Sequence, residues 1–254
     1  MEKQITKNQN KNMIVLSSVI LLLAFIFWIA IDRVAIYLTD IFLAGSFGYV
    51  WLMLHHAIQI VLALAIMVLP VWHKSLAEWG FTIKNHRKTF EIILKFSIGW
   101  IICTTIFTLV TQWLSGWSPL LDFYFNWENI LSYLIFESII VGISEEIVFR
   151  GLVYGVLTPH FNNKIKLPGF SISYAGVISA IFFSIAHIGF QIIPFSITSI
   201  APMQVFVAFA LGVFYAVVRE KTGSLLGPIL AHNISDGWLS ILYIIIQSVS
   251  RVTR

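Results

Sequence analysis

Charged residues are scarce in this sequence. Of its 254 residues, 11% are Asp, Glu, Lys or Arg, whereas 58% are hydrophobic. Because a soluble domain usually carries about 25% charged residues, the composition excludes an ordinary soluble protein and indicates an integral membrane protein. Cysteine is scarcer still. Cys103 is the single cysteine, which excludes an intrachain disulfide and leaves the redox compartment unidentified.

The sequence also lacks a concentrated basic patch. The formal net charge is +4, but the lysines and arginines are dispersed and are not interleaved with aromatic residues. A nucleic-acid partner is therefore not expected. The basic residues fall between apolar runs instead, as they do in the cytoplasmic loops of proteins embedded in a lipid bilayer.

Long runs without charge predict the membrane spans, each of which needs about 20 residues. The first run, residues 13–31, is longer than a signal-peptide core and has no small-residue cleavage site after it, so we predict a retained span. The apolar run at 167–218 is long enough for two helices, with Pro194 and Pro202 marking the hairpin between them. The other predicted spans cover residues 49–71, 96–113, 130–149 and 225–249.

The fold class that follows is an all-α integral membrane protein, a bundle of seven or eight transmembrane helices. Placing the N-terminus in the cytoplasm puts nearly all lysines and arginines in inner segments, which predicts a multi-pass protein of the cell membrane with a cytoplasmic N-terminus. Arg251 and Arg254 depart from this pattern and suggest an eighth, shorter element. The basic inner loop, residues 73–88, has Trp79 and Phe81 among its charges and resembles an interfacial amphipathic segment.

Charged residues inside a predicted span are expensive and are usually functional. The stretch SEEIVFRG places Glu146 and Arg150 four residues apart, so on a helix they can form an ion pair. Glu145 lies about 100° around the helix from Glu146 and points elsewhere. It therefore needs another partner or a function of its own.

Two later spans supply candidate partners for Glu145. FFSIAHIGF places Phe183 and His187 four residues apart, well inside the fifth predicted span, and GPILAHNISD places His232 and Asp236 on one face of the last span. In a bundle core these groups can converge. They would supply a general base, proton shuttles and oxyanion partners, or ligands for a divalent metal.

Less specific interpretations exist for several polar residues. We predict that His55 and His56 form hydrogen bonds between helices, and that Glu137 either makes a buried polar contact or shares a cavity with Glu145. A proton-coupled transporter could use the same acids and histidines as a relay, although no inverted repeat is present. A non-catalytic membrane partner is a third possibility.

Taken in order, the motifs EEIVFR, FSIAH and HNISD resemble the CPBP family, which comprises CAAX prenyl proteases and bacteriocin-processing membrane proteases and is also called the abortive-infection family. The flank REKTGSLLGPILAH resembles that family too. The resemblance covers about residues 130–247. It suggests two parts, an N-terminal region of three spans with the basic inner loop at 1–128 and a CPBP-like catalytic core of four or more spans at 129–254.

The resemblance implies an intramembrane endopeptidase that acts on a peptide or membrane-protein substrate. Glu145 would activate the attacking water together with His187, and His232 with the residue at 236 would hold the oxyanion. Supporting residues would be Glu146, Arg150 and Phe183. Position 236 is often Asn in the family. An ionised aspartate cannot donate a hydrogen bond to an oxyanion, so Asp236 is either protonated, an orienter of His232, or a metal ligand.

Whether a cofactor is needed stays open in the sequence. The family is commonly labelled metalloprotease, yet a metal-free mechanism is also proposed for it, and the zincin motif H-E-x-x-H is missing here. If a divalent metal such as zinc is bound, Glu145, His187 and His232 are the expected ligands. The Ile-rich composition favours a bacterial role in peptide processing or bacteriocin immunity.

The depth of His187 predicts how its helix starts. A helix starting at residue 167 would place His187 about 30 Å into the membrane at 1.5 Å per residue, far from Glu145. We therefore expect residues 167–174 to be mostly extended, and a polar cavity to open to the cytoplasmic side.

Overall fold

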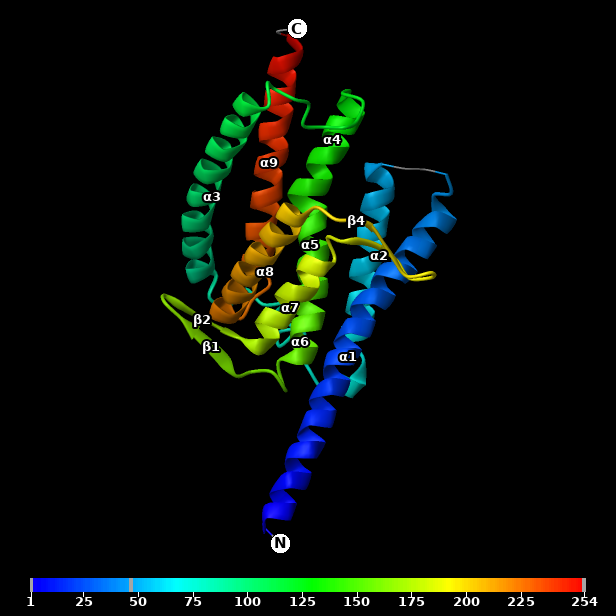
Figure 1. The fold of residues 1–254 in the computed structure, drawn as a ribbon, viewed down its shortest axis with the longest axis vertical. Coiled ribbons are helices and arrows are strands. Elements are labelled where there is room, and N and C mark those ends of the chain that lie inside the picture. The colour runs from blue at the N-terminus through cyan, green and yellow to red at the C-terminus, as the bar shows by residue number, and fades with distance from the viewer. Residues whose placement is uncertain (1, 46–47, 253–254) are drawn as a thin grey trace.

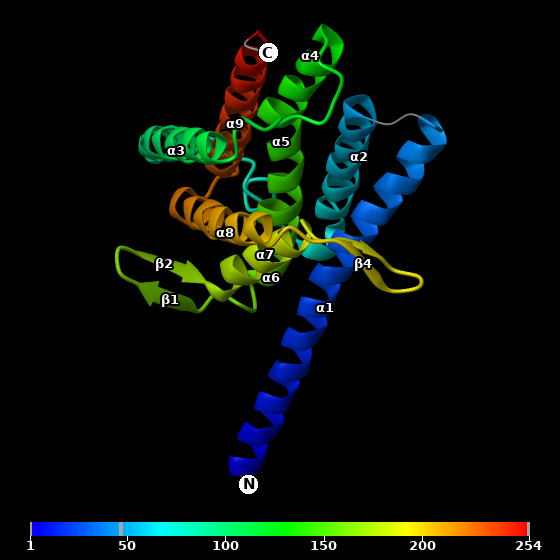
Figure 2. The same cartoon turned by 45° about the horizontal axis from the view of Figure 1, so that its top comes forward.

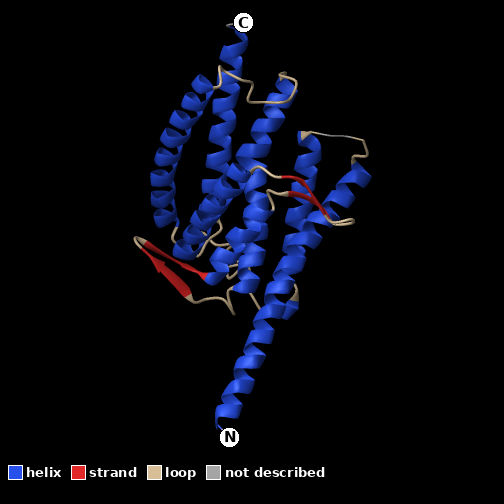
Figure 3. Cartoon of the chain, in the orientation of Figure 1, coloured by secondary structure: helices blue, strands red, loops and turns tan. Residues whose placement is uncertain are grey.

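A computed structural model of the protein describes residues 2–45 and 48–252, with side chains described for 14–45 and 48–249. Its helices form a bundle with the N-terminus at one end and the C-terminus at the opposite end (Figure 1). In the described part of the chain, strands are confined to two small hairpins (Figure 3). The chain is thus mostly helical, as the sequence predicts.

Five of the described helices are long and apolar enough to cross a membrane, which supports a multi-pass membrane protein. Helices α1 and α2 lie side by side on one flank of the bundle, and α3 lies on the other flank against α9 (Figures 1 and 2). The count of seven or eight spans stays a prediction. The five helices are α1 (Glu2–Phe42), α2 (Tyr49–Met67), α3 (His86–Leu114), α8 (Pro202–Thr222) and α9 (Leu226–Val252).

The predicted fourth span forms the central helix, which runs unbroken through residues 127–157. It begins at Asn126, whose side chain accepts a hydrogen bond from the backbone N–H of Asn129 at 2.9 Å, a normal N-cap. Residues 146–157 are all buried, as expected for a helix surrounded by others. Its segments are α4 (Trp127–Ile135), a π-helical segment (Phe136–Ile140), α5 (Val141–Glu146), a second π-helical segment (Ile147–Val153) and α6 (Tyr154–Leu157).

The stretch before the fifth predicted span is extended, as predicted. Strand β1 (Lys164–Leu167) pairs antiparallel with β2 (Phe170–Ser173), and α7 (Tyr174–Ile185) begins directly after β2. Ser173 fixes this start, because its hydroxyl oxygen accepts the backbone N–H of Gly176 at 3.0 Å.

The fifth span itself is shorter than predicted. Helix α7 has 12 residues, which at 1.5 Å each amount to about 18 Å, too short to cross a bilayer. His187 follows the end of this helix and does not lie well inside a span, which corrects the sequence-based expectation. Strands β3 (Gly189–Gln191) and β4 (Ser196–Ser199) then form a hairpin that reaches toward α1 (Figure 2). Helix α8 starts at Pro202, a residue favoured in a first helical turn.

The lysine- and arginine-bearing connections, including the β1–β2 hairpin and the turn between α8 and α9, gather at the end of the bundle from which the N-terminal helix extends (Figure 1). The loop before α3 belongs to this end and is packed into the core. Trp79 is fully buried, and Gly155 is needed beneath it because a Cβ at that position would collide with the indole ring. Lys74 donates to the Gly155 carbonyl at 2.5 Å. Trp79 therefore does not lie in a lipid interface as the sequence suggested.

Candidate functional site

The two adjacent glutamates lie at the end of α5, between the two π-helical segments. Such segments occur frequently at functional sites. The side chain of Glu146 is 0% exposed, whereas that of Glu145 is 21% exposed. The two carboxylates thus point in different directions, and the buried one is the one with the charged partner.

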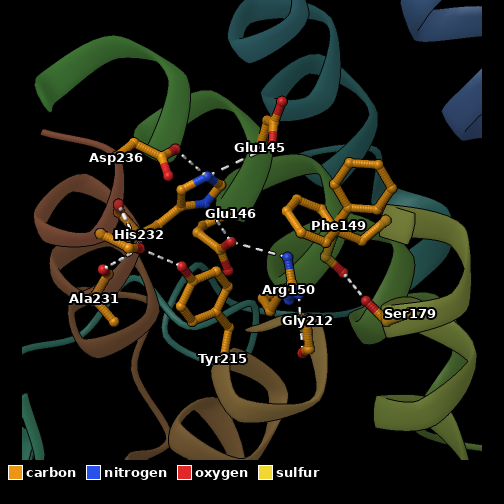
Figure 4. Close-up of polar contacts among 12 residues, drawn as sticks. Glu145, Glu146, Phe149, Arg150, Ser179, Gly212, Tyr215, Ala231, His232 and Asp236 are labelled. Atoms are coloured by element: carbon orange, nitrogen blue, oxygen red, sulfur yellow. Dashed lines mark hydrogen bonds and ion pairs between the residues drawn. The ribbon is translucent and has the colours of Figure 1, made fainter. Parts of the chain in front are cut away.

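Glu146 forms the predicted ion pair with Arg150. One carboxylate oxygen, Oε1, accepts from Nη1 of Arg150 at 2.9 Å, and both side chains are fully buried. The guanidinium also donates to the carbonyl of Gly212 on α8 at 2.9 Å (Figure 4). It lies 4.4 Å from the centre of the Phe183 ring. Gly212 allows this approach, because a Cβ there would crowd Arg150 and Phe183. The pair therefore ties the central helix to α7 and α8.

His232 on α9 is held between carboxylates. Its Nδ1 is 2.9 Å from the same Oε1 of Glu146, and its Nε2 is 3.0 Å from Asp236 and 3.7 Å from Glu145 (Figure 4). Its ring stacks on Tyr215 with centroids 5.1 Å apart. An ionised carboxylate can only accept a hydrogen bond, so each ring nitrogen acts as a donor toward it. This contact is the one expected if Asp236 orients His232, and the role of Asp236 stays a prediction.

The central helix and α9 approach closely beside His232. Gly142 lies at the crossing, and a Cβ on it would collide with the side chain of Asn233, the neighbour of His232. The absence of a side chain at 142 thus brings the glutamates within reach of the histidine.

His187 occupies the turn after α7. Its Nδ1 is 2.8 Å from the carbonyl oxygen of Phe183, and its ring meets the Phe183 ring edge-on at 4.9 Å. Because a carbonyl oxygen only accepts, Nδ1 carries the hydrogen. The other nitrogen, Nε2, then has a free lone pair that can accept a proton or a hydrogen bond from water.

A cavity of about 450 Å³ brings the predicted residues together. Glu145, His187, His232 and Asp236 all line it, and Glu137 does as well. Apolar and aromatic side chains complete its wall, among them Trp100, Phe136, Val207, Leu211 and Leu239.

The cavity extends from Glu145 toward Glu137 and Tyr243, which is the direction of the C-terminal end of α9 and away from the basic loops (Figure 1). If the basic loops are cytoplasmic, this direction leads away from the cytoplasm. The cytoplasmic N-terminus and the cytoplasmic opening of the cavity, both predicted from the sequence, are therefore in tension in this fold. Both stay predictions.

His56 is a cavity residue that the sequence argument missed. Its ring lines the cavity, and its Nδ1 is buried without a hydrogen-bond partner, so it does not make the expected contact through that atom. The Nε2 of His55 lies 3.6 Å from Asp32 on α1, but its hydrogen bond is with Gln59 on its own helix, so through this atom His55 does not form the expected hydrogen bond between helices. Adjacent helical residues point about 100° apart, so the sequence could have predicted that these two histidines have different surroundings. Tyr215 was also missed, and no sequence signal marks it.

The residues expected to bind a metal do not fit one in this arrangement. Both ring nitrogens of His232 face carboxylates, so neither offers a free lone pair. Glu145 and Nε2 of His187 remain, fewer than the three protein ligands of a usual catalytic zinc site. Within residues 2–45 and 48–252, no group of three or more His, Cys, Asp or Glu is placed to hold a metal ion.

Comparison with known proteins identifies the part of the chain that carries this site. Residues 126–238 match the family model described as type II CAAX prenyl endopeptidase Rce1-like. No curated protein and no solved structure matches the chain. The matched segment starts at the cap of the central helix and ends just beyond Asp236, so it contains all the predicted site residues. The match confirms the resemblance that the three motifs indicate. The division of the chain at residues 128 and 129 stays a prediction.

Proposed function

Since residues 126–238 belong to the CPBP family of CAAX-type membrane endopeptidases, we propose that this protein hydrolyses peptide bonds in the membrane through a water molecule activated by Glu145. The observation that carries the proposal is the partly exposed Glu145 carboxylate on a cavity also lined by His187, His232 and Asp236. The buried pair of Glu146 and Arg150 lies outside the cavity lining, and Glu146 contacts the cavity residue His232.

In this mechanism Glu145 is the general base. It removes a proton from a water molecule as the water oxygen bonds to the scissile carbonyl carbon, and the proton passes to the leaving nitrogen as the C–N bond breaks. His187 assists, because the lone pair on Nε2 can accept a hydrogen bond from the same water. The two groups come from different elements but share one cavity.

His232 is assigned to the oxyanion. Its Nε2–H donates to Asp236 at 3.0 Å in the free protein and would donate to the developing negative charge instead once a peptide carbonyl lies in the cavity. Glu146 holds Nδ1 on the opposite edge of the ring and fixes the ring orientation. Together, Glu146 and Asp236 keep a hydrogen on each ring nitrogen. Asp236 and Glu146 are thus positioning residues, and Arg150 acts through Glu146.

The proposed substrate is a peptide or a membrane-protein segment that places an apolar side chain or lipid group against the apolar wall of the cavity. Bacterial peptide processing or bacteriocin immunity is the proposed biological role, supported by the Ile-rich composition of the chain. The proposed location is the cell membrane, with the N-terminus in the cytoplasm.

A cleavage assay in proteoliposomes tests the activity. The probes are a fluorogenic farnesylated CAAX peptide, the same peptide without its lipid, and a pool of bacteriocin leader peptides. Glu145→Gln should lower cleavage by about 10²–10⁴-fold, the usual contribution of a general base. Glu128→Gln, at an exposed acid near the start of α4, is the matched control and should behave as wild type. Proton flux without cleavage would identify a transporter, and neither activity would identify a non-catalytic partner.

A chelator experiment tests the metal-free form of the mechanism. Cleavage should persist after dialysis against 1,10-phenanthroline, because His232 offers no free nitrogen. Loss of cleavage that zinc restores would overturn this part of the proposal.

A further inference from the structure

A second polar cavity, of about 260 Å³, lies beside the first, between α1, α2 and the central helix. Glu145 and His56 line both cavities. Three more polar side chains line the second one, Asp32 on α1 and His55 and Gln59 on α2. Glu145 is therefore reached from two sides, and its second side faces polar groups outside the family motifs.

These polar groups form a connected row that ends next to Glu145. The amide nitrogen of Gln59 donates to Nε2 of His55 at 2.9 Å and to Asp32 at 3.4 Å. The amide oxygen of Gln59 accepts from the hydroxyl of Ser144 at 3.2 Å. Ser144 directly precedes Glu145. A cavity that is polar and leaves about 30 Å³ for each molecule suits ordered water.

Hydrolysis consumes one water molecule for every bond cleaved, and a substrate lying in the first cavity would displace the water there. Asp32 is an ionisable residue within α1, a helix long and apolar enough to cross a membrane, and such residues are expensive there and mark functional paths. Resting on the proposed function, we propose that the second cavity is a water reservoir that supplies Glu145 while the substrate occupies the first cavity. The row from Asp32 to Ser144 holds this water.

The competing explanation is that Gln59, Asp32 and His55 only fasten α1 to α2. A substitution that fills the cavity but leaves the polar row intact distinguishes the reservoir from this competing explanation. Leu52 lines the second cavity, so Leu52→Phe would displace water from it, and Ile36→Phe would fill the same cavity from α1. The matched control is Leu62→Phe on the same helix, where Leu62 lines a separate apolar pocket.

Cleavage of the most active probe peptide is measured for each variant in proteoliposomes. We expect Leu52→Phe and Ile36→Phe to lower kcat at least tenfold with KM changed less than twofold, because substrate still binds but water arrives slowly. Leu62→Phe should stay within twofold of wild type in both. The melting temperatures of all three variants are measured. If one of the two filling variants does not fold, the conclusion is drawn from the other.

A second measurement does not depend on activity. Trp28 is 5% exposed and lines the second cavity, so hydroxyl-radical footprinting with ¹⁸O-labelled water reports whether exchanging water reaches it. We expect Trp28 to be oxidised in wild type and in Leu62→Phe, and at least fivefold less in Leu52→Phe. An unmodified Trp28 in wild type, or a wild-type kcat in both filling variants, would overturn the reservoir. Failure of the proposed function is distinct, since then wild type and control alike would cleave no probe.

Discussion

A Glu146→Gln substitution should act mainly by lowering the free energy of unfolding, and not by removing a contact with substrate. Glu146 is fully buried and its Oε1 is the shared acceptor for Arg150 and His232, each at 2.9 Å. Removing one partner of a buried ion pair costs about 3–5 kcal/mol. The glutamine retains an acceptor oxygen, and Arg150 retains its bond to the Gly212 carbonyl. We therefore expect the lower end, about 3 kcal/mol in the free energy of unfolding, and a fall in Tm on the order of 10 °C.

Thermal unfolding of the purified protein in detergent measures this, with Glu145→Gln as the comparison. The nearest ion-pair partner of Glu145 is His232 at 3.7 Å, beyond hydrogen-bond reach, so Glu145→Gln should change Tm by less than about 2 °C. It should still lower cleavage by about 10²–10⁴-fold, because the general base is lost. A double variant, Glu146→Gln with Arg150→Met, should be less destabilised than the sum of the single variants, because it leaves no unpaired buried charge. Unchanged melting in both glutamine variants, with equal loss of cleavage, would refute this assignment.

Three further outcomes are expected. His187→Gln should lower kcat by about 10²-fold or more with little change in Tm, and wild-type kcat would remove His187 from the mechanism. Asp236→Asn should retain cleavage within about tenfold, because the amide oxygen can still accept from His232, whereas Asp236→Leu should lose it; equal kcat/KM in these two variants would contradict the orienting role. In a Cys103→Ser background, cysteines at the cavity-lining positions Gln204 and Leu239 should react with a membrane-impermeant thiol reagent from the face that exposes a C-terminal tag. If that face is the outer one, the predicted cytoplasmic opening is wrong.

The polar part of the site could be predicted because it depends on short sequence spacings. Glu146 and Arg150 on the central helix pair as expected from their separation of four residues. His232 and Asp236, also four residues apart, pair in the same way on α9. Charges in an apolar run are conspicuous, so their number and order were enough to identify the family. The extended segment before Tyr174 was predicted for a similar reason, since a continuous helix would have carried His187 too far from Glu145.

Other features depend on contacts that an apolar sequence does not record. No acid, lysine or arginine interrupts residues 167–218, so the early end of α7 leaves no clear signal. Pro194 marks the turn between β3 and β4, but nothing in the run marks the two strands themselves. Part of the reason lies elsewhere in the chain, because Arg33 on α1 donates to the carbonyl of Phe190 in the hairpin at 3.4 Å. Trp79 reads as an interfacial residue, yet it is buried because Gly155 leaves space for its ring.

The two π-helical segments explain why the spacing argument worked only in part. A π turn has a longer hydrogen-bonded repeat than an α turn, so the segment at Phe136–Ile140 rotates Glu137 relative to Glu145. An α-helical projection across that segment is therefore unreliable, although it still placed both acids on one cavity. Glu146 and Arg150 still form their ion pair across the second π-helical segment, because contacts with three helices set the geometry of the pair. The carbonyl of Gly212 and the ring of His232 hold the two side chains from α8 and α9. A buried ion pair is weak evidence for added stability, but one that contacts three elements fixes how they meet, and here they meet at the residue next to Glu145.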